Sequence, residues 1–168
     1  MIQIEICSNK RQWSRFTDFY IEHRTRIIPY YRLSLAVRDV RNYMRQGRGA
    51  IITNERDQVV GIGSFVLGLE ENGYQDKGIA VLGNSCFVEE YQNNRTFVRG
   101  LQVLAEQIED ANPDVREVRI PTSADNAYTN RLYHKLATLH HTVDSNYGKV
   151  NVYTTPFRDY KAFCDRYR

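Results

Sequence analysis

Apolar and polar residues follow patterns that predict strands in the first half of the chain. Residues 2–7 alternate isoleucine with polar side chains, which is typical of a half-buried strand. Two further apolar runs, residues 50–53 and 59–67, are joined by a polar link of hairpin length. A longer apolar run extends from Ile79 to Val88. Because the links between the last three runs are short, they predict an antiparallel meander.

Helical spacing marks the segments between the first two strands. Residues 10–24 carry four aromatic side chains three or four positions apart, so we expect a helix with one buried aromatic face, capped by Ser8 or Asn9. A second helix is predicted over 36–46, and Gly47 follows at its C-terminal position.

The second half of the chain alternates helical and strand patterns. The elements predicted there are a helix over 97–109, a strand over 115–121, a helix over 126–136, strands over 140–144 and 149–154, and a short amphipathic helix over 157–168. A strand, helix, strand passage predicts one parallel crossover. We therefore expect one α/β (α+β) domain over residues 1–168, with a mixed, mostly antiparallel sheet of six to seven strands and helices on both faces.

Composition and charge narrow the class of protein. The chain has 168 residues, of which 42% are hydrophobic and 26% charged, as in an ordinary soluble domain. It holds no apolar run of the ~20 residues that a membrane helix needs, and its start does not resemble a signal peptide. We expect a cytoplasmic protein without a membrane partner.

The basic residues do not form the stripe that a nucleic-acid binder usually carries. The net charge is +3, and basic residues are scattered among acidic ones. The densest arginine stretch, residues 24–48, is interpreted as the solvated face of two helices. The other interpretation is a surface for an acidic or nucleotide-bearing partner.

The cysteines predict neither a disulfide framework nor a metal site. There are three of them, with no CxxC or Cys/His metal spacing. Cys86 lies among apolar neighbours, where a small buried hydrophobe is expected instead of a nucleophile.

A polar turn from Glu89 to Thr96 joins the strand that ends at Val88 to the helix predicted from Phe97. The first N–H groups of a helix have no intrahelical acceptor, and the helix dipole favours an anion there. The turn is therefore a candidate phosphate site, although most strand-to-helix turns bind nothing.

Two motifs resemble those of the Gcn5-related N-acetyltransferases (GNAT). Residues 80–88, followed by Glu-Glu-Tyr-Gln-Asn-Asn-Arg-Thr-Phe, are similar to the run V-x-P-E-Y-R-G-x-G-x-G, which cradles the acetyl-CoA pyrophosphate in that family. Residues 126–136, Asn-Ala-Tyr-Thr-Asn-Arg-Leu-Tyr-His-Lys-Leu, resemble N-x-x-A-x-x-L-Y-x-K-L-G-F. The resemblance covers roughly residues 49–153. It implies the acyl-CoA N-acyltransferase fold and acetyl-CoA as cosubstrate.

The first motif departs from the family pattern, because Arg95 and Phe97 stand where the family has Gly and then Gly or Ala. Glycine allows close approach of the backbone to a ligand, whereas Arg95 can contact a phosphate through its side chain. The cofactor-binding residues that the resemblance implies are Phe87, Val88, Gln92, Asn93, Asn94, Arg95, Thr96, Phe97, Asn126 and Tyr133.

The resemblance also implies roles in the reaction. Tyr133 matches the tyrosine that protonates the leaving thiolate, and the alternative is that it only packs the helix. Asn126 matches a contact to the pantetheine arm, or it is only a helix cap. The backbone amides near Phe87 and Val88, where the strand must bulge, would polarise the thioester carbonyl.

Candidates for the general base are carboxylates near the end of the strand. Glu89 is the first, with Glu90, Glu70 and Glu71 as alternatives, and each of them is more often a solvated surface carboxylate. Some members of the family need no dedicated base.

The leading hypothesis is an acetyl-CoA-dependent N-acetyltransferase that acts on a primary amine of a small molecule or a protein by direct attack on the thioester. The alternative is a catalytically weak GNAT-like domain that binds an acyl-CoA or a protein partner as a sensor. Loss of the loop glycines favours the alternative, and the intact spacing of Asn126 and Tyr133 favours the enzyme. The tail helix packs on the domain or on a partner, which leaves a homodimer open.

Overall fold

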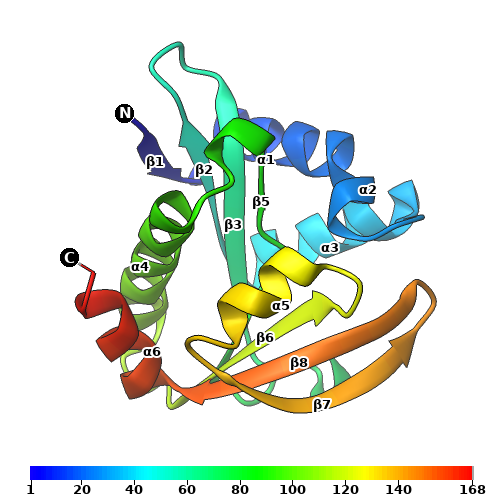
Figure 1. Ribbon diagram of the computed structural model, residues 1–168, viewed down its shortest axis with the longest axis vertical. Helices are drawn as coiled ribbons and strands as arrows, with labels where there is room; N and C mark the ends of the chain where they lie inside the picture. The colour runs from blue at the N-terminus through cyan, green and yellow to red at the C-terminus, as the bar shows by residue number, and fades with distance from the viewer. Residues whose placement is uncertain (168) are drawn as a thin grey trace.

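The computed structural model describes residues 1–167, which are built around one mixed sheet (Figure 1). Its strands are β1 (Gln3–Ile6), β2 (Gly47–Thr53), β3 (Val59–Leu67), β4 (Ile79–Leu82), β5 (Cys86–Phe87), β6 (Glu117–Ser123), β7 (Thr138–Ser145) and β8 (Gly148–Pro156). Its α-helices are α1 (Lys10–Glu22), α2 (Arg24–Ile27), α3 (Leu33–Gln46), α4 (Asn94–Ala111), α5 (Ala127–Tyr133) and α6 (Phe157–Asp165), with short 3-10 turns η1 (Glu70–Asn72) and η2 (Glu89–Tyr91).

The strands lie in the order β1-β2-β3-β4-β6-β8-β7, and β5 pairs with β3 beside β4. The pair β4–β6 is parallel and the other pairs described are antiparallel. This confirms the mixed, mostly antiparallel sheet with one parallel crossover. The sheet has eight strands instead of six to seven, because the single strand expected from Ile79 to Val88 is divided into β4 and β5.

Helices cover both faces of the sheet, as predicted (Figure 1). Adjacent strand residues point to opposite faces, so Ile52 and Phe65 join the core beneath α4 and α6, whereas Ile51 and Val66 join the core beneath α1 and α3. Burial on both faces explains why these strands read as continuous apolar runs. Within residues 1–167, none of the helices combines the length and the apolar character that crossing a bilayer requires.

Several predicted helix boundaries were wrong by a few residues. The helix expected from Phe97 begins at Asn94, because Asn93 is its cap and accepts a hydrogen bond from the Thr96 amide at 2.9 Å. The polar turn is shorter as a result, and Thr96 lies inside the helix. The segment expected as one helix over 10–24 gives α1 and the separate short α2, and α3 begins at Leu33.

A bulge separates β4 from β5. Phe65 lies opposite Leu82, but Ile62 lies opposite Cys86, so the three residues 83–85 face two residues of β3. An extra residue in one strand bends that strand and breaks its ladder locally. The bulge was expected near Phe87 and Val88 and lies instead at residues 83–85.

A network of tyrosine hydroxyls joins α1 and α3 to the bulge. Tyr31 donates a hydrogen bond to Asp39, and the Tyr20 hydroxyl lies 2.9 Å from that of Tyr31 and 3.4 Å from that of Tyr43. Asn84 donates to Tyr20 through its side chain at 3.0 Å and to Tyr43 through its backbone amide at 3.3 Å. The network therefore holds the bulge against the helices.

The direction of these hydrogen bonds follows from the carboxylate. An ionised Asp39 only accepts, so Tyr31 uses its single proton on Asp39 and must accept from Tyr20. Tyr20 in turn accepts from Tyr43. Burial raises the pKa of Tyr20 and of Tyr43 well above the ordinary value, so both hydroxyls keep their protons.

We predict that Gly83→Ala destabilises the fold. A Cβ at residue 83 would come within 2.0 Å of the Ser64 hydroxyl oxygen and 2.8 Å of the Tyr43 ring, and such overpacking costs about 1–3 kcal/mol. The control is Gly100→Ala in α4, where the nearest atom to the new Cβ is 3.8 Å away. There the change should stabilise the helix by about 0.5–1 kcal/mol. Urea unfolding measures both, and equal effects of the two changes would contradict the prediction.

We also predict that Tyr31→Phe lowers the free energy of unfolding by about 1–3 kcal/mol, because it leaves the buried Tyr20 hydroxyl without its Tyr31 acceptor and removes one of two donors from Asp39. Tyr30→Phe is the matched control, since Tyr30 is 88% exposed. Chemical denaturation of the two variants should show a loss in the first alone. A Tyr31 variant as stable as the Tyr30 variant would show that the network contributes nothing to stability.

Candidate active site

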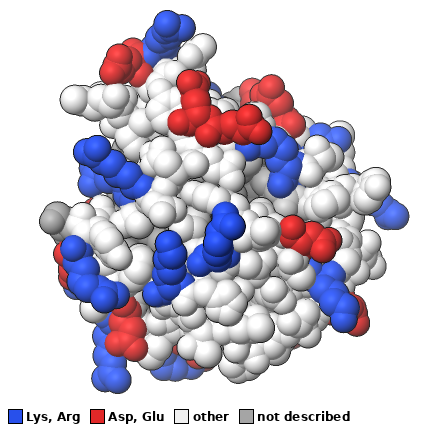
Figure 2. All heavy atoms as spheres, in the orientation of Figure 1, with Lys and Arg blue, Asp and Glu red and all other residues white. Residues whose placement is uncertain are grey.

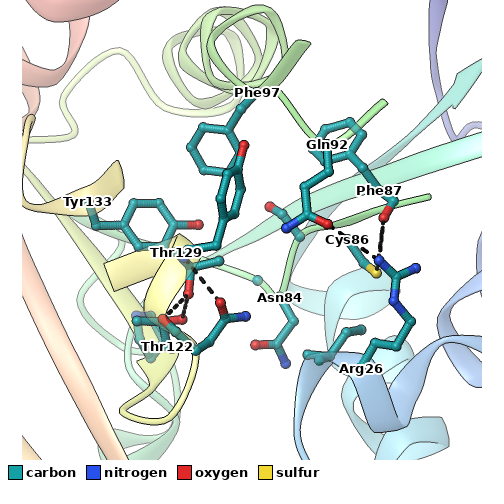
Figure 3. A pocket seen from close by; sticks show the side chains of 15 residues that line it. Arg26, Asn84, Cys86, Phe87, Gln92, Phe97, Thr122, Thr129 and Tyr133 are labelled. Atoms are coloured by element: carbon teal, nitrogen blue, oxygen red, sulfur yellow. Dashed lines mark hydrogen bonds between the residues drawn. The ribbon is translucent and has the colours of Figure 1, made fainter. Parts of the chain in front are cut away.

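The candidate site lies where two neighbouring strands diverge. Beyond the bulge, β5 stays paired with β3, while β6 continues with β8. A narrow pocket opens between residues 83–87 on one side and Pro121 and Thr122 on the other (Figure 3). Residues of α2, the start of α4 and α5 close its ends. The bulge thus creates a gap in the middle of the sheet.

The predicted cofactor residues fall into two groups around the start of α4. The residues that line the pocket are Phe87, Gln92, Phe97, Asn126 and Tyr133. The residues that line a wider groove on the outer side of α4 are Asn93, Asn94, Arg95 and Thr96. Val88 and Glu89 line neither. Lys and Arg side chains on this face of the molecule stand apart, with acidic side chains among them, and form no continuous stripe (Figure 2).

Tyr133 reaches the pocket from the last turn of α5 and is 3% exposed. Its hydroxyl points toward the interior of the pocket (Figure 3), which Ser85 of the bulge also lines. Burial raises the pKa of Tyr133 well above its ordinary value, and the polar side chain of Ser85 offsets part of that rise. The side chain is therefore a protonated donor at neutral pH.

Phe97 forms an inner wall of the pocket. Its side chain is 4% exposed, and its ring centroid lies 5.6 Å from that of Tyr133 and 6.4 Å from that of Phe87. A glycine at this position would leave the space of the ring open. Phe97, which stands where the family motif has Gly or Ala, therefore narrows the pocket and fixes the orientation of Tyr133 by packing.

The backbone at β5 offers one amide to the pocket. The Val88 amide donates to the Val60 carbonyl at 2.9 Å, so it is not available for a ligand. Along an antiparallel ladder, residues that hydrogen-bond to the partner strand alternate with residues that do not. Phe87 is one of the latter, so its N–H and C=O point away from β3. Of the two amides expected to polarise a carbonyl, only that of Phe87 faces the gap.

Arg26 is a site residue that the sequence interpretation missed. Its guanidinium donates to the Phe87 carbonyl at 3.0 Å and lies 3.5 Å from the Gln92 side-chain oxygen (Figure 3). The interpretation of residues 24–48 as a solvated face was also wrong for Tyr31 and Tyr43, which are buried. A usable signal was the Ile-Ile-Pro sequence directly after Arg26, which an exposed helix face would not carry.

Asn126 caps α5 and lines the pocket. Its side-chain oxygen accepts from the Thr129 amide at 3.1 Å. Its NH2 group donates no hydrogen bond within the described part of the chain and remains available to a ligand. The cap interpretation is confirmed, and it is compatible with the ligand contact that the resemblance implies.

The first turn of α4 retains free donors. Asn93 satisfies the Thr96 amide, whereas the amides of Asn94 and Arg95 have no acceptor within the helix. The side chains of Asn94 and Arg95 are exposed at the same end. Two amides and one guanidinium are therefore presented where the helix dipole favours an anion.

The carboxylates expected as bases lie outside this pocket. Glu89 and Glu90 are exposed, and among the described residues that line the pocket none is Asp or Glu. Cys86 lines the pocket but is 8% exposed, and burial raises the pKa of its thiol. This agrees with the expectation of a small buried hydrophobe instead of a nucleophile.

No protein-family model matches this sequence, and no curated protein matches it significantly. Solved structures do match in shape. A GNAT-family acetyltransferase from Staphylococcus aureus Mu50 superposes with a TM-score of 0.69 at 11% identity, over 92% of this chain and 99% of that one. The ribosomal-protein-S5-alanine acetyltransferase from Vibrio fischeri gives 0.68 at 9% identity, over 95% of both chains.

A third similar structure is the aminoglycoside acetyltransferase AAC(6')-Ib in complex with paromomycin and acetyl-CoA. It superposes with a TM-score of 0.69 at 13% identity, over 95% of this chain and 96% of that one. Likeness across almost the full length of all three chains, at such low identity, is a likeness of fold. The chain therefore has the fold of the GNAT acetyltransferases.

Proposed function

We propose that this chain is an N-acetyltransferase that takes its acetyl group from acetyl-CoA and passes it to a primary amine. One observation carries the proposal: the buried Tyr133 hydroxyl and the free Phe87 amide meet in one gap of the sheet, within a fold shared with acetyltransferases. Two of the similar structures, both of AAC(6')-Ib, hold acetyl-CoA with paromomycin or coenzyme A with kanamycin.

The residues present fit acetyl-CoA. The pyrophosphate would lie at the start of α4, on the amides of Asn94 and Arg95 and beside the Arg95 guanidinium. The pantetheine arm is thin and unbranched, as the narrow pocket requires, and one of its amide carbonyls matches the free NH2 of Asn126.

The roles of the chain's own residues follow from this placement. Acetyl-CoA supplies an activated acyl group in the form of a thioester. The Phe87 amide would donate to the thioester carbonyl oxygen, where negative charge develops during attack by the amine. Tyr133 would give its proton to the departing sulfur. Glu89 is exposed outside the pocket, so it can act as a base only through water.

The alternative function, an acyl-CoA or partner-binding domain with weak catalysis, is favoured by Arg95 and Phe97. These two residues replace the small residues of the family loop, and the Phe97 ring narrows the pocket beside Tyr133. Isothermal titration with acetyl-CoA separates the cases. Absence of binding at millimolar cofactor would remove the enzyme, and binding without turnover on any amine would favour the alternative.

We predict that Arg95→Ala weakens acetyl-CoA binding by about 1.5–3 kcal/mol, because a guanidinium–phosphate contact is a charge-assisted hydrogen bond. Titration calorimetry measures the change, and Arg158→Ala on α6 is the control for loss of one exposed arginine. The contact should also weaken as salt is added. If Arg95→Gly instead raises the affinity, the arginine obstructs the loop and the direct contact is wrong.

We predict that Tyr133→Phe lowers kcat by roughly 10²–10⁴-fold while acetyl-CoA affinity stays nearly unchanged, because only the acidic proton is lost and the ring still packs. Tyr153→Phe is a matched control. Tyr153 is also buried and contacts the Tyr133 ring, but its hydroxyl donates to Asn130 and it does not line the pocket. That variant should lose stability and keep turnover.

Steady-state assays with a panel of amines measure both tyrosine variants. Slow hydrolysis of acetyl-CoA by the protein serves as the assay until an acceptor is found. Turnover by the Tyr133 variant equal to that of the parent protein would retire its role as an acid and favour the binding domain.

A further inference from the structure

A second cavity lies on the α3 side of the sheet and meets the first pocket. It has a volume of about 250 Å³ and is enclosed by α3, the loop that contains η1, and β4. Gly83, Asn84 and Pro121 line both cavities. Pockets for drug-sized ligands usually measure about 300–1,000 Å³, so this one suits a smaller molecule. A molecule in it would approach the gap from the side opposite to α4.

The lining of this second cavity is acidic and aromatic. Asp39 comes from α3 and Glu70 and Glu71 come from η1, while Tyr43 and Tyr74 supply ring surfaces. Neither lysine nor arginine is among the described residues that line it. This combination of carboxylates and aromatic rings attracts an organic cation and repels an anion.

Two basic residues stand beside the cavity without lining it. Arg38 lies 3.3 Å from Asp39 and 3.9 Å from Glu70, and its side chain is 53% exposed. Lys77 lies 5.7 Å from the centroid of the Tyr74 ring. Three carboxylates line the cavity, whereas these two cations lie outside the lining. The lining itself therefore keeps an excess of negative charge.

The loop that carries the carboxylates is fixed close to β4. Gly68 has φ +98°, and a Cβ there would lie 2.6 Å from the Tyr74 Cα. Only glycine allows both this conformation and this approach. The close packing of Gly68 against Tyr74 therefore determines where Glu70 and Glu71 face the cavity.

Behind Gly83 lies an unpartnered polar group. The Ser64 hydroxyl has no hydrogen-bond partner among the described residues, and Ser64 is fully buried. It is directed at the place that a side chain of residue 83 would occupy, in the wall shared by the two cavities. Ser64 lines neither cavity, so this hydroxyl marks the packing behind Gly83 and not a contact to a ligand.

We propose that the second cavity receives the acceptor as a small amine that carries a second positive charge, such as an alkyl diamine. The proposal rests on the proposed function and names its substrate class. The reacting amine would enter the gap beside Gly83 and Asn84, and the second ammonium group would stay among Asp39, Glu70 and Glu71. Asp39 is held for this role by the hydrogen bond from Tyr31.

The test compares three amines of equal chain length: diaminobutane, butylamine and aminobutyrate. Their second groups are cationic, neutral and anionic. We expect the highest kcat/KM with diaminobutane and the lowest with aminobutyrate. The double variant Glu70→Gln, Glu71→Gln should reduce the preference for diaminobutane over butylamine by about three- to tenfold, which is the scale of two partly exposed ion pairs.

The matched control is the double variant Glu22→Gln, Glu55→Gln, which removes the same charge from exposed positions that do not line the cavity. It should keep the preference of the parent protein. Equal kcat/KM for diaminobutane and butylamine in the parent, or an equal loss of preference in both double variants, would overturn the proposal.

Titration of diaminobutane in the absence of acetyl-CoA separates this proposal from the proposed function. Binding that depends on Glu70 and Glu71, in a protein that does not bind acetyl-CoA, would keep the amine site and remove the transferase. Acetyl-CoA binding together with acetylation of butylamine and diaminobutane at equal rates would keep the transferase and remove the diamine site.

Discussion

The one-residue register shift beside β3 is the constraint on which the site depends. Because three residues of the chain face two of β3 at the bulge, β5 leaves the line of β4 and no longer pairs with β6. If the ladder continued without the bulge, the strand would stay beside β6, the Phe87 amide would point toward β3, and the gap would close. The same bulge brings Ser85 into the lining of the pocket that Tyr133 also lines. An irregularity in pairing, and not an additional element, thus produces the pocket.

The bulge is stabilised from the face of the sheet that α1 and α3 cover. Asn84 donates two hydrogen bonds to buried tyrosine hydroxyls, which themselves lead to Asp39 on α3. Gly83 leaves room for Ser64 and Tyr43 to approach. Since Asp39 and Tyr43 also line the second cavity, the groups that hold the bulge are the groups that a bound amine would contact. Occupation of that cavity and the shape of the gap are therefore physically linked.

The sequence was sufficient for the sheet and much less so for the site. Alternating apolar residues indicate a strand buried on one face, and a continuous apolar run indicates a strand buried on both faces. These patterns predicted the strands, and the short links between them predicted the antiparallel neighbours. A bulge adds a residue without interrupting an apolar run, which is why the division between Leu82 and Cys86 was not predicted. The contact of Arg26 with Phe87 joins segments far apart in the chain, and no local pattern reports it. Asn126 and Tyr133 line one pocket because Asn126 caps the short helix that Tyr133 ends, so their spacing fixes their relative position. Their roles toward acetyl-CoA stay a prediction.

The two departures from the glycine loop lie in different places, Arg95 in the groove outside α4 and Phe97 in the pocket. Arg95 is exposed at the first turn of α4, where Asn93 has already taken the Thr96 amide. In the proposed function a side-chain charge there would substitute for close backbone approach, and such a contact would be more sensitive to salt than buried amide donors. Phe97 instead faces inward and packs on Tyr133. It takes space from the pocket but restricts the rotation of the hydroxyl that the proposed chemistry needs. For the proposed transferase, the loss of glycine would therefore change cofactor affinity through Arg95 and restrict the Tyr133 ring through Phe97.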